Sequence, residues 1–377
     1  MLNNENKEVY NHINSIRVRS FRSHNDIELS PGKSSVLIVG KNGVGKTSIL
    51  EALSIFSHGK GIRNAKFYDM IKNDKDSFLV DISLSTSGDF SWCYKTSYSK
   101  KSRSRKILIN DKEVSANNAR KNIPMLWIAP YTERIFLGSS NMRRGFLDRL
   151  VAIFDNEHSV RLNEYDKNLK QRAKLLKDGI NDLNWLEVIE DHLSKLSVAI
   201  SSSRLETINR LTKYLANSLK YFPSIDISFS DSIEKKLENE PAIDVEETLA
   251  KDYYKNREVD TFLGGSRVGC HKTDLIFKNL EKNLNAELCS SGEQKSLLIS
   301  IVLAAASAFK EYKRKSPIIL LDEIFTHLDF SRKVKLLERL IEIKSQIWIT
   351  ATEKESFFQN KENFWYHNLE GNRIKNA

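Results

Sequence analysis

An eight-residue stretch, GKNGVGKT from Gly40 to Thr47, constrains the fold more than any other part of this sequence. It matches the pattern G-x-x-x-x-G-K-[ST], in which backbone N–H groups turn inward around phosphate oxygens at the start of a helix. The flanking residues fit this pattern. SVLIV (35–39) is a short apolar run typical of a buried strand, and apolar residues recur at helical spacing after Thr47. The sequence therefore predicts a strand, a phosphate-binding loop and a helix in succession.

The loop supplies most of the predicted nucleotide contacts. Lys46 is expected to reach the β- and γ-phosphates and to act in catalysis, and the Thr47 hydroxyl is expected to ligate Mg²⁺. A Gly-rich turn that matches by chance is the alternative, and the strand and helix on either side disfavour it. The remaining expected contacts come from the loop backbone and the first helical turn: Gly40, Asn42, Gly43, Gly45 and Ser48.

An acidic pair follows a second apolar run. Ile318 to Leu321 (IILL) precede Asp322 and Glu323. At the tip of a buried strand, Asp322 can hold Mg²⁺ while Glu323 orients and deprotonates the attacking water. Such a strand end is common by itself. Together with the phosphate-binding loop it indicates a catalytic site for ATP hydrolysis, with ATP and Mg²⁺ as cofactors.

The segment SSGEQ (290–294) opens a long apolar stretch and resembles the signature motif of the ABC ATPase superfamily. That resemblance implies a head-to-tail homodimer closed by ATP, in which the motif of one copy contacts the γ-phosphate bound by the other. Asp329 resembles the superfamily's D-loop aspartate and is also an expected nucleotide contact. The same segment fits a helix N-cap with Glu293 in the first turn, and both roles are compatible. The signature contacts implied are Ser291, Gly292 and Gln294.

Two features of many ABC ATPases are missing from the sequence. No glutamine occurs before Gln171, so the Q-loop glutamine is absent. The predicted last strand, QIWIT, also lacks the switch histidine. Thr350 or Thr352 would have to replace it.

Further segments, spread over residues 13 to 352, are similar to the RecF family of SMC-like ATPases. The RRGFLDRL and GCHKTDL segments are the more particular to this family, although Cys270 and Lys272 stand where it commonly has proline and arginine. The resemblance implies an ATP-dependent dimer on DNA with slow, DNA-stimulated and Mg²⁺-dependent hydrolysis. It also implies help in loading RecA at gapped DNA with RecO and RecR, in recombinational repair and the SOS response. The similar segments are IRVRSFRS (16–23), LEAL (50–53), GKGIR (59–63), RRGFLDRL (143–150) and GCHKTDL (269–275).

The fold class expected is α/β: an ABC-type P-loop ATPase head with a mixed sheet, an antiparallel β subdomain and an inserted helical arm. Alternating apolar residues predict the β subdomain over about 78–125. Leucine and isoleucine spacing without proline predicts helices from about Arg143 to Lys220. We therefore expect residues 1–130 and 262–377 to form the head and 131–261 to form the arm.

The last third of the chain alternates between helix and strand, as a parallel sheet requires. We expect a helix over about 292–313, the strand PIILLD, a helix over about 330–344 and the strand QIWIT. A polar stretch from Ser228 to Glu247 is expected to separate this part from the arm.

Positive charge is concentrated between Lys95 and Lys121. The whole chain has 59 Lys and Arg against 49 Asp and Glu, a net charge of +10, and this segment alone has nine basic residues against two acidic ones. On a β hairpin, such a cluster suits contacts to DNA phosphates that do not read bases. A solvated hairpin tip is the alternative. The expected DNA contacts are Lys100, Lys101, Arg103, Arg105 and Lys106.

Two further groups allow two interpretations each. Arg143, Arg144 and Arg149 either line the nucleotide or DNA side of a dimer or form a basic helix face that pairs with Glu133 and Asp148; the structural interpretation is slightly favoured. His271 and Asp274 are catalytic in type, but a capping or hydrogen-bonded core role is equally compatible.

Other classes of protein fit less well. The three cysteines form no close pair, the most apolar run (296–309) is too short to cross a bilayer, and the N-terminus lacks a signal peptide, so a cytoplasmic protein without a membrane partner is expected. The alternative to a DNA-bound ATPase is another SMC-like or transporter-type ABC subunit. A GTPase is disfavoured because no Asn-Lys-x-Asp motif occurs. A nuclease fusion is disfavoured because only about 25 residues follow Thr352. A DNA binder that does not hydrolyse ATP stays open.

Overall fold

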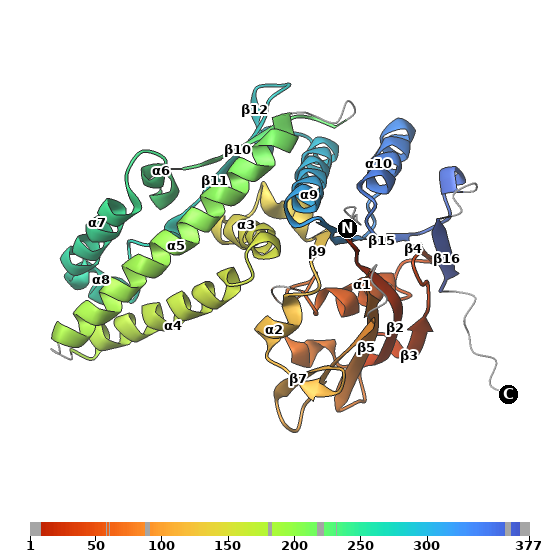
Figure 1. The fold of residues 1–377 in the computed structure, drawn as a ribbon, viewed down its shortest axis with the longest axis horizontal. Coiled ribbons are helices and arrows are strands. Elements are labelled where there is room, and N and C mark those ends of the chain that lie inside the picture. Colours follow the sequence, from red (N-terminus) through yellow and green to blue (C-terminus); the bar gives the residue numbers. More distant parts are fainter. Residues whose placement is uncertain are drawn as a thin grey trace, which may run out of the picture. The chain divides into compact units, whose positions relative to one another are not determined.

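The computed structural model describes residues 9–57, 59, 61–86, 91–179, 183–216, 222–230, 232–358 and 363–369. Lys60 of the GKGIR segment and residues 217–220 of the expected helical block lie outside these ranges. The chain divides into two compact units: Met1–Glu133 with Ser218–Pro223 and Ser290–Ala377, and Arg134–Asn217 with Ser224–Cys289. Figure 1 colours the first unit mainly red to orange and blue, and the second yellow through green to cyan.

A five-stranded parallel sheet forms the base of the first unit. Four of its five strands are continuous, buried apolar runs, as expected for a parallel sheet that is covered on both faces, whereas the fifth, at the sheet edge, is half-buried to exposed. SVLIV, PIILLD and QIWIT are all confirmed as strands. The strand order is β16 (Phe364–Asn368), β4 (Ser35–Val39), β15 (Ile347–Ala351), β14 (Ile318–Leu321) and β9 (Met125–Ile128).

Three helices of this unit follow the predicted positions. Helix α1 spans Lys46–Ser54, directly after the glycine-rich loop, and α10 spans Phe330–Ile343. Helix α9, Ser291–Lys313, packs against β9 and is buried along most of its length, which explains its nearly uniform apolar character. None of the helices in the described ranges combines the length and the apolar character that a membrane span needs.

Antiparallel strands form a separate six-stranded sheet in the same unit. The predicted β subdomain is therefore confirmed, and it also includes the first two long strands of the chain. The other sheet of the head was expected to be mixed, but its strand pairs among the described residues are all parallel. The order is β3 (His24–Leu29), β2 (His12–Phe21), β5 (Ser77–Ser85), β6 (Ser91–Ser99), β7 (Ser104–Ile109) and β8 (Lys112–Glu113).

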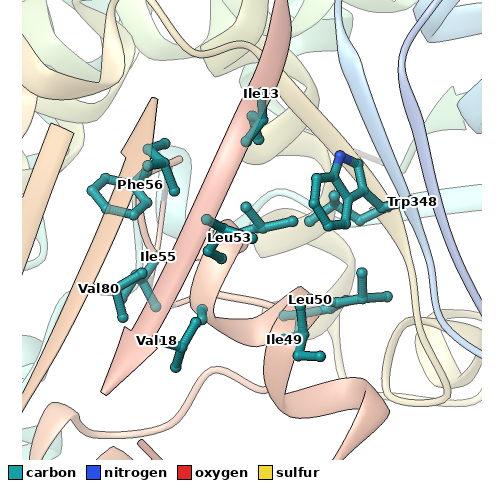
Figure 2. Close-up of a cluster of buried hydrophobic side chains, with 14 of the residues drawn as sticks. Ile13, Val18, Ile49, Leu50, Leu53, Ile55, Phe56, Val80 and Trp348 are labelled. Atoms are coloured by element: carbon teal, nitrogen blue, oxygen red, sulfur yellow. The ribbon is translucent and has the colours of Figure 1, made fainter. Parts of the chain in front are cut away.

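Helix α1 joins the cores of the two sheets. Figure 2 shows Leu50 and Leu53 of α1 in one cluster with Ile13 of β2 and Trp348 of β15, and all four side chains are fully buried. Burial of each of these side chains stabilises the fold by roughly 1.5–3 kcal/mol. The start of α1, and with it the glycine-rich loop, is therefore fixed to both sheets.

The second unit is helical with one small antiparallel sheet. Helix α5, Leu183–Ala216, packs against α4, His158–Lys177, and α7, Ala242–Lys255, around a common apolar core. The helical block predicted from Arg143 onward is confirmed by α3 (Ser140–Phe154), α4 and α5. The unit also contains α6 (Ile233–Leu237), α8 (Arg257–Leu263), β10 (Ile225–Phe229), β11 (Leu275–Asn279) and β12 (Leu284–Asn285).

The polar stretch from Ser228 to Glu247 is not a separator, contrary to the prediction. It holds the end of β10, all of α6 and the start of α7. Val245, Leu249 and Tyr253, spaced at four-residue intervals, bury one face of α7.

The second unit also extends further along the chain than the predicted arm. It ends at Cys289 and not at residue 261, because β11 pairs with β10 from Ile225↔Asn279 to Phe229↔Leu275.

Short elements complete the described chain. Strand β1 (Val9–Tyr10) pairs in parallel with β13 (Lys315–Ser316), and α2 spans Ala116–Arg120. Single-turn 3₁₀ helices span Phe67–Met70, Thr132–Ile135, Cys270–Lys272, Ala286–Leu288 and Ser356–Phe358.

Candidate nucleotide-binding site

The glycine-rich loop connects β4 to α1 with the backbone that the motif requires. Gly43 and Gly45 have φ of +86° and +102°, a region that favours glycine. The buried Lys46 side chain folds back over the loop and donates hydrogen bonds to the carbonyl oxygens of Gly40 (2.6 Å) and Lys41 (3.0 Å). The loop N–H groups and the N-terminus of α1 thus offer donors for phosphate oxygens, with an ammonium group beside them.

The turn between β2 and β3 packs against this loop. A Cβ on Gly45 would lie 2.3 Å from Oγ of Ser23 and 2.6 Å from Nε2 of His24, so no other residue fits there. Nε2 of His24 lies 3.0 Å from the Gly45 carbonyl oxygen, which fits a neutral ring that donates to this oxygen. Burial lowers the pKa of His24, which favours that neutral form.

The two predicted metal ligands, Thr47 and Asp322, lie in contact. The Thr47 hydroxyl is 3.0 and 2.9 Å from the two carboxylate oxygens of Asp322. Thr350 donates a second hydrogen bond to Oδ1 of Asp322 at 2.7 Å. Burial raises the pKa of Asp322, and the hydrogen bonds from Thr350 and Thr47 oppose this rise. A buried carboxylate beside a hydroxyl fits Mg²⁺, which prefers oxygen ligands.

Glu323 is held at the edge of the same site. Its backbone has φ of +50°, and its N–H donates to the Thr350 hydroxyl at 2.9 Å. Of the two threonines considered as replacements for a switch histidine, Thr350 is fully buried against Asp322 and Glu323, whereas Thr352 is exposed. Thr350 therefore occupies the position from which both acidic residues can be oriented.

A cavity of about 480 Å³ lies in front of the loop, within the usual range for small-molecule sites. It brings together the predicted residues Gly43, Gly45, Lys46, Thr47, Ser48 and Glu323. Its other lining residues received no role from the sequence: Arg22, Ser23, Arg63, Asp69, Ile71, Lys72 and Asn73.

Two of these unassigned residues, Arg22 and Arg63, surround a buried carboxylate. Arg22 makes a bidentate pair with the fully buried Glu51 of α1 (2.9 and 2.6 Å), and Nη1 of Arg63 lies 3.7 Å from Glu51. Glu51 thus holds two guanidinium groups at the cavity. In the sequence, the family resemblance was the signal that could have identified these residues, because Arg22, Glu51 and Arg63 lie in the IRVRSFRS, LEAL and GKGIR segments, respectively.

The signature segment forms a helix cap. The Ser290 hydroxyl accepts from the N–H of Glu293 (3.4 Å), and the Glu293 carboxylate accepts from the N–H (2.9 Å) and the hydroxyl (3.0 Å) of Ser290. A Cβ on Gly292 would lie 3.4 Å from the carbonyl oxygen of His327, so the expected D-loop passes close to this turn. Ser291 is exposed at the first position of α9, Gln294 is buried, and Asp329 caps α10 by accepting from the N–H of Arg332 (2.9 Å).

The basic hairpin differs from the prediction at one position. Lys101, Arg103 and Lys106 are exposed, and Lys100 and Arg105 are half-buried, but the Arg105 guanidinium is bound within the unit. Arg105 donates to Oγ1 of Thr96 and to the Ile55 carbonyl oxygen, both at 2.8 Å, and lies over the Phe67 ring. Burial lowers its pKa to about 9. Arg105 is therefore a packing residue and not a free contact for DNA.

In the second unit, the RRGFLDRL and GCHKTDL segments bind each other. Arg143 makes a bidentate pair with Asp274 at 2.7 Å, and Arg144 donates to the Thr273 carbonyl oxygen at 2.7 Å. The structural interpretation thus matches the contacts of Arg143 and Arg144, but they bind Asp274 and Thr273 and not the predicted Glu133 and Asp148. Glu133 pairs with Lys295, and Asp148 pairs with Arg204 and His158.

His271 also has a structural environment. Its Nδ1 accepts from the Tyr165 hydroxyl (2.6 Å), and its Nε2 lies 3.0 Å from the Ser266 carbonyl oxygen. Burial, followed by the nearby charges of Lys272 and Arg144, lowers its pKa to about 4. The described residues contain no group of three or more His, Cys, Asp or Glu arranged to hold a metal ion. Cys93, Cys270 and Cys289 form no disulfide.

Comparison with known proteins agrees with this geometry. The RecF/RecN/SMC N terminal domain family matches residues 12–374. The protein named DNA replication and repair protein RecF from Rickettsia rickettsii (strain Sheila Smith) is 34% identical over 357 residues, which cover 94% of this chain and 98% of the relative. This chain belongs to the RecF family. The RecF of Rickettsia prowazekii (strain Madrid E) is 35% identical over 358 residues, with the same coverage.

Solved structures show the same fold. The structure titled recombination mediator protein RecF-ATP in the RecFOR pathway has a TM-score of 0.82 at 22% identity and covers 92% of this chain and 95% of that chain. An SMC head domain from Pyrococcus furiosus has a TM-score of 0.50 at 17% identity, and the match covers 91% of this chain and 90% of that chain. The fold predicted from the sequence, an ABC-type ATPase head with an inserted arm, is confirmed. Membership in the RecF family and the motif geometry identify this chain as an ATPase of the ABC type.

Proposed function

We propose that this chain is an ATP-driven switch on DNA that acts in replication and recombinational repair. ATP closes a head-to-tail homodimer, and slow hydrolysis opens it again. The observation that carries the proposal is the convergence of Thr47, Asp322 and Glu323 beside the phosphate-binding loop. The names of the RecF relatives support the role in DNA replication and repair.

Each residue of the site has a distinct role in the proposed reaction. Lys46 exchanges its contacts with the Gly40 and Lys41 carbonyl oxygens for the β- and γ-phosphates. Thr47 and Asp322 hold Mg²⁺, which neutralises phosphate charge when bound. Glu323 orients a water molecule in line with the γ-phosphate and accepts its proton.

Closure of the dimer uses the exposed start of α9. Ser291 and Gly292 present backbone N–H groups at a helix N-terminus to the γ-phosphate of the partner copy. Gln294 follows in the same helix turn, and Asp329 lies two residues after His327, whose carbonyl oxygen is close to Gly292. A preference of ATP for the closed form of about 100-fold shifts the equilibrium by about 2.7 kcal/mol, for example from about 1:10 to about 10:1 in favour of the closed form. Slow hydrolysis then acts as a timer and needs no high turnover.

DNA binds to the exposed part of the basic hairpin in this proposal. Lys100, Lys101, Arg103 and Lys106 remain accessible after Arg105 is removed from the predicted set. Lysine and arginine on a hairpin position a duplex through its phosphates without sequence readout. The family resemblance adds the finer role of assisting RecA loading at gapped DNA together with RecO and RecR.

Analytical ultracentrifugation with ATP, ADP or no nucleotide, each with gapped, single-stranded and duplex DNA, tests the switch. We expect dimers only with ATP, and monomers of Lys46→Ala under all conditions. Dimerisation and tight DNA binding by Lys46→Ala with ATP would overturn the proposal. Phosphate release with and without DNA separates it from a DNA binder that does not hydrolyse ATP.

A further inference from the structure

Lys295 is a buried charged residue of the first unit, with its side chain only 2% exposed. Its ammonium group contacts three oxygens: the Glu323 carbonyl oxygen at 3.0 Å, Oγ1 of Thr326 at 2.7 Å and Oε1 of Glu133 at 3.0 Å. An ammonium group has three N–H donors, so each donor has a partner. Burying a lysine is costly unless it is paired in this way. Nothing in the phosphate-binding site itself requires a lysine at this position.

Two of the three contacts fix the backbone of the proposed catalytic base. Glu323 has φ of +50°, a conformation that is disfavoured for residues with a Cβ. The residue is held from both sides, because its N–H donates to Thr350 and its carbonyl oxygen accepts from Lys295. The Thr326 hydroxyl donates to the same carbonyl oxygen at 2.7 Å. The direction of the Glu323 side chain therefore depends on Lys295.

The backbone of Lys295 belongs to the start of α9. It follows Gln294 directly and lies within the first two turns of the helix, which Ser291 opens. Successive hydrogen-bonded turns move together, so a displacement of the helix start also displaces Lys295. The Lys295 side chain thus connects the start of α9, which is proposed to bind the partner's nucleotide, with Glu323, which is proposed to act on the nucleotide of its own protomer.

We infer that Lys295 is a positioning residue that couples the two nucleotide sites of the dimer. When the partner's ATP docks on the start of α9, Lys295 sets Glu323 of its own protomer into line for hydrolysis. This role rests on the proposed function, because only a head-to-tail dimer brings a second nucleotide to α9. Hydrolysis at each site then depends on occupancy of the other.

Lys295→Met tests this role with little change in shape. Methionine keeps an unbranched apolar stem and removes the donors, and Glu133, at 28% side-chain exposure, can be solvated instead. Glu133→Gln is the matched control, because it removes the charge of the ion pair and leaves the bonds from Lys295 to Glu323 and Thr326. We expect kcat to fall for Lys295→Met while nucleotide affinity and ATP-dependent dimerisation stay at the wild-type level. Glu133→Gln should retain most of kcat.

Mixed dimers separate positioning from damage to α9. A reporter protomer with Glu323 intact is mixed with an excess of a companion that carries Glu323→Gln, and phosphate release in a single turnover is measured. Lys295→Met in the reporter should slow release by about 10- to 100-fold, the range expected for a misplaced catalytic group. Lys295→Met in the companion, in addition to Glu323→Gln, should leave release unchanged. The positioning role is overturned if release is equally fast with Lys295→Met in the reporter and with Lys295→Met in the companion. It is also overturned if release slows only when the companion carries the substitution.

A companion that cannot bind nucleotide tests the coupling itself. With Lys46→Ala in the companion, the reporter's ATP still docks on the companion, but no nucleotide reaches α9 of the reporter. We expect the wild-type reporter to slow to the rate of the Lys295→Met reporter, and the Lys295→Met reporter to slow no further. Additive losses overturn the coupling. If sedimentation shows no ATP-dependent dimers of the wild-type chain, the proposed function itself fails. If dimers form but the reporter releases phosphate at the same rate with and without Lys295→Met, only the role of Lys295 fails. Lys295→Gln serves in each mixture if Lys295→Met does not fold.

Discussion

Thr350 and Asp322 are joined by a hydrogen bond of 2.7 Å, in which the hydroxyl at the end of β15 donates to Oδ1 of the carboxylate. The same hydroxyl accepts the N–H of Glu323 at 2.9 Å. Thr350 therefore orients the expected metal ligand and the expected base with one oxygen atom. It does so without a group that titrates near neutral pH, unlike the histidine found on this strand in many ABC ATPases.

Replacing Thr350 with valine should impair both the fold and the reaction. Thr350→Val keeps the shape but removes the hydrogen bonds to Asp322 and from Glu323, which costs about 1–3 kcal/mol of unfolding free energy when buried polar groups are left unpaired. ATP hydrolysis should fall by about 10- to 100-fold because the base loses its alignment. Denaturant titration and phosphate release measure the two effects. Thr352→Val, at an exposed position, is the control and should change neither.

In the basic hairpin, substitutions of exposed residues should weaken DNA binding, whereas substitution of the packing residue Arg105 should lower stability. Lys101→Ala with Arg103→Ala should weaken DNA binding and reduce the slope of log K against log salt by about 2, since each lost phosphate contact contributes about 0.9. Arg105→Ala should leave that slope unchanged. It should lower the free energy of unfolding by about 2 kcal/mol, because it removes two hydrogen bonds and the contact with Phe67. Fluorescence anisotropy over a salt series distinguishes the two, and an altered slope for Arg105→Ala would contradict its role as a packing residue bound to Thr96 and Ile55.

His271 should make stability depend on pH in the acid range. Burial lowers its pKa in the folded protein to about 4 from the ordinary value of 6.5, so between these pH values the unfolded chain binds a proton that the folded chain does not. Stability is therefore complete above pH 6.5 and declines as the pH falls towards 4, by about 3 kcal/mol in total. Denaturant midpoints at a series of pH values measure the decline. His271→Gln should remove this part of the pH dependence, and an unchanged profile would show that the histidine is not buried neutral.

Two glycines of the family-like segments should respond in opposite directions to alanine. Gly269 has φ of +122°, and a Cβ there would lie 2.1 Å from the Tyr165 hydroxyl oxygen and 2.4 Å from that of Tyr253. Gly269→Ala should therefore cost about 3 kcal/mol or more. Gly145 lies inside α3, and a Cβ there meets no atom within 4 Å. Gly145→Ala should stabilise the protein by up to about 1 kcal/mol. Thermal unfolding of both variants tests the contrast.

Local patterns in the sequence were sufficient to predict most elements of the head. The loop from Gly40 to Thr47 has a fixed spacing, and continuous apolar runs mark β4, β14 and β15. Both signals arise from neighbouring residues, so they can be read without knowledge of the tertiary fold. The contact between Thr47 and Asp322 also follows, because the carboxyl ends of parallel strands meet at one edge of a sheet.

Contacts between distant segments were not accessible in this way. The group of Arg22, Glu51 and Arg63 depends on three segments whose side chains meet only after folding. Arg105 has the same sequence context as its exposed neighbours, and only its strand register turns it inward. The second unit continues to Cys289 because β11 pairs with β10, and pairing partners leave no local signal.

The cap of α9 has a consequence for any phosphate that approaches it. The carboxylate of Glu293 accepts hydrogen bonds from the hydroxyl and the backbone N–H of Ser290, so the helix N-terminus already has a negatively charged group bound to it. Two negative charges repel each other at short range, so this carboxylate opposes an incoming phosphate beside the N–H groups of Ser291 and Gly292. In the proposed dimer, this carboxylate opposes the binding of the partner's nucleotide, so a weak encounter leaves the two copies apart.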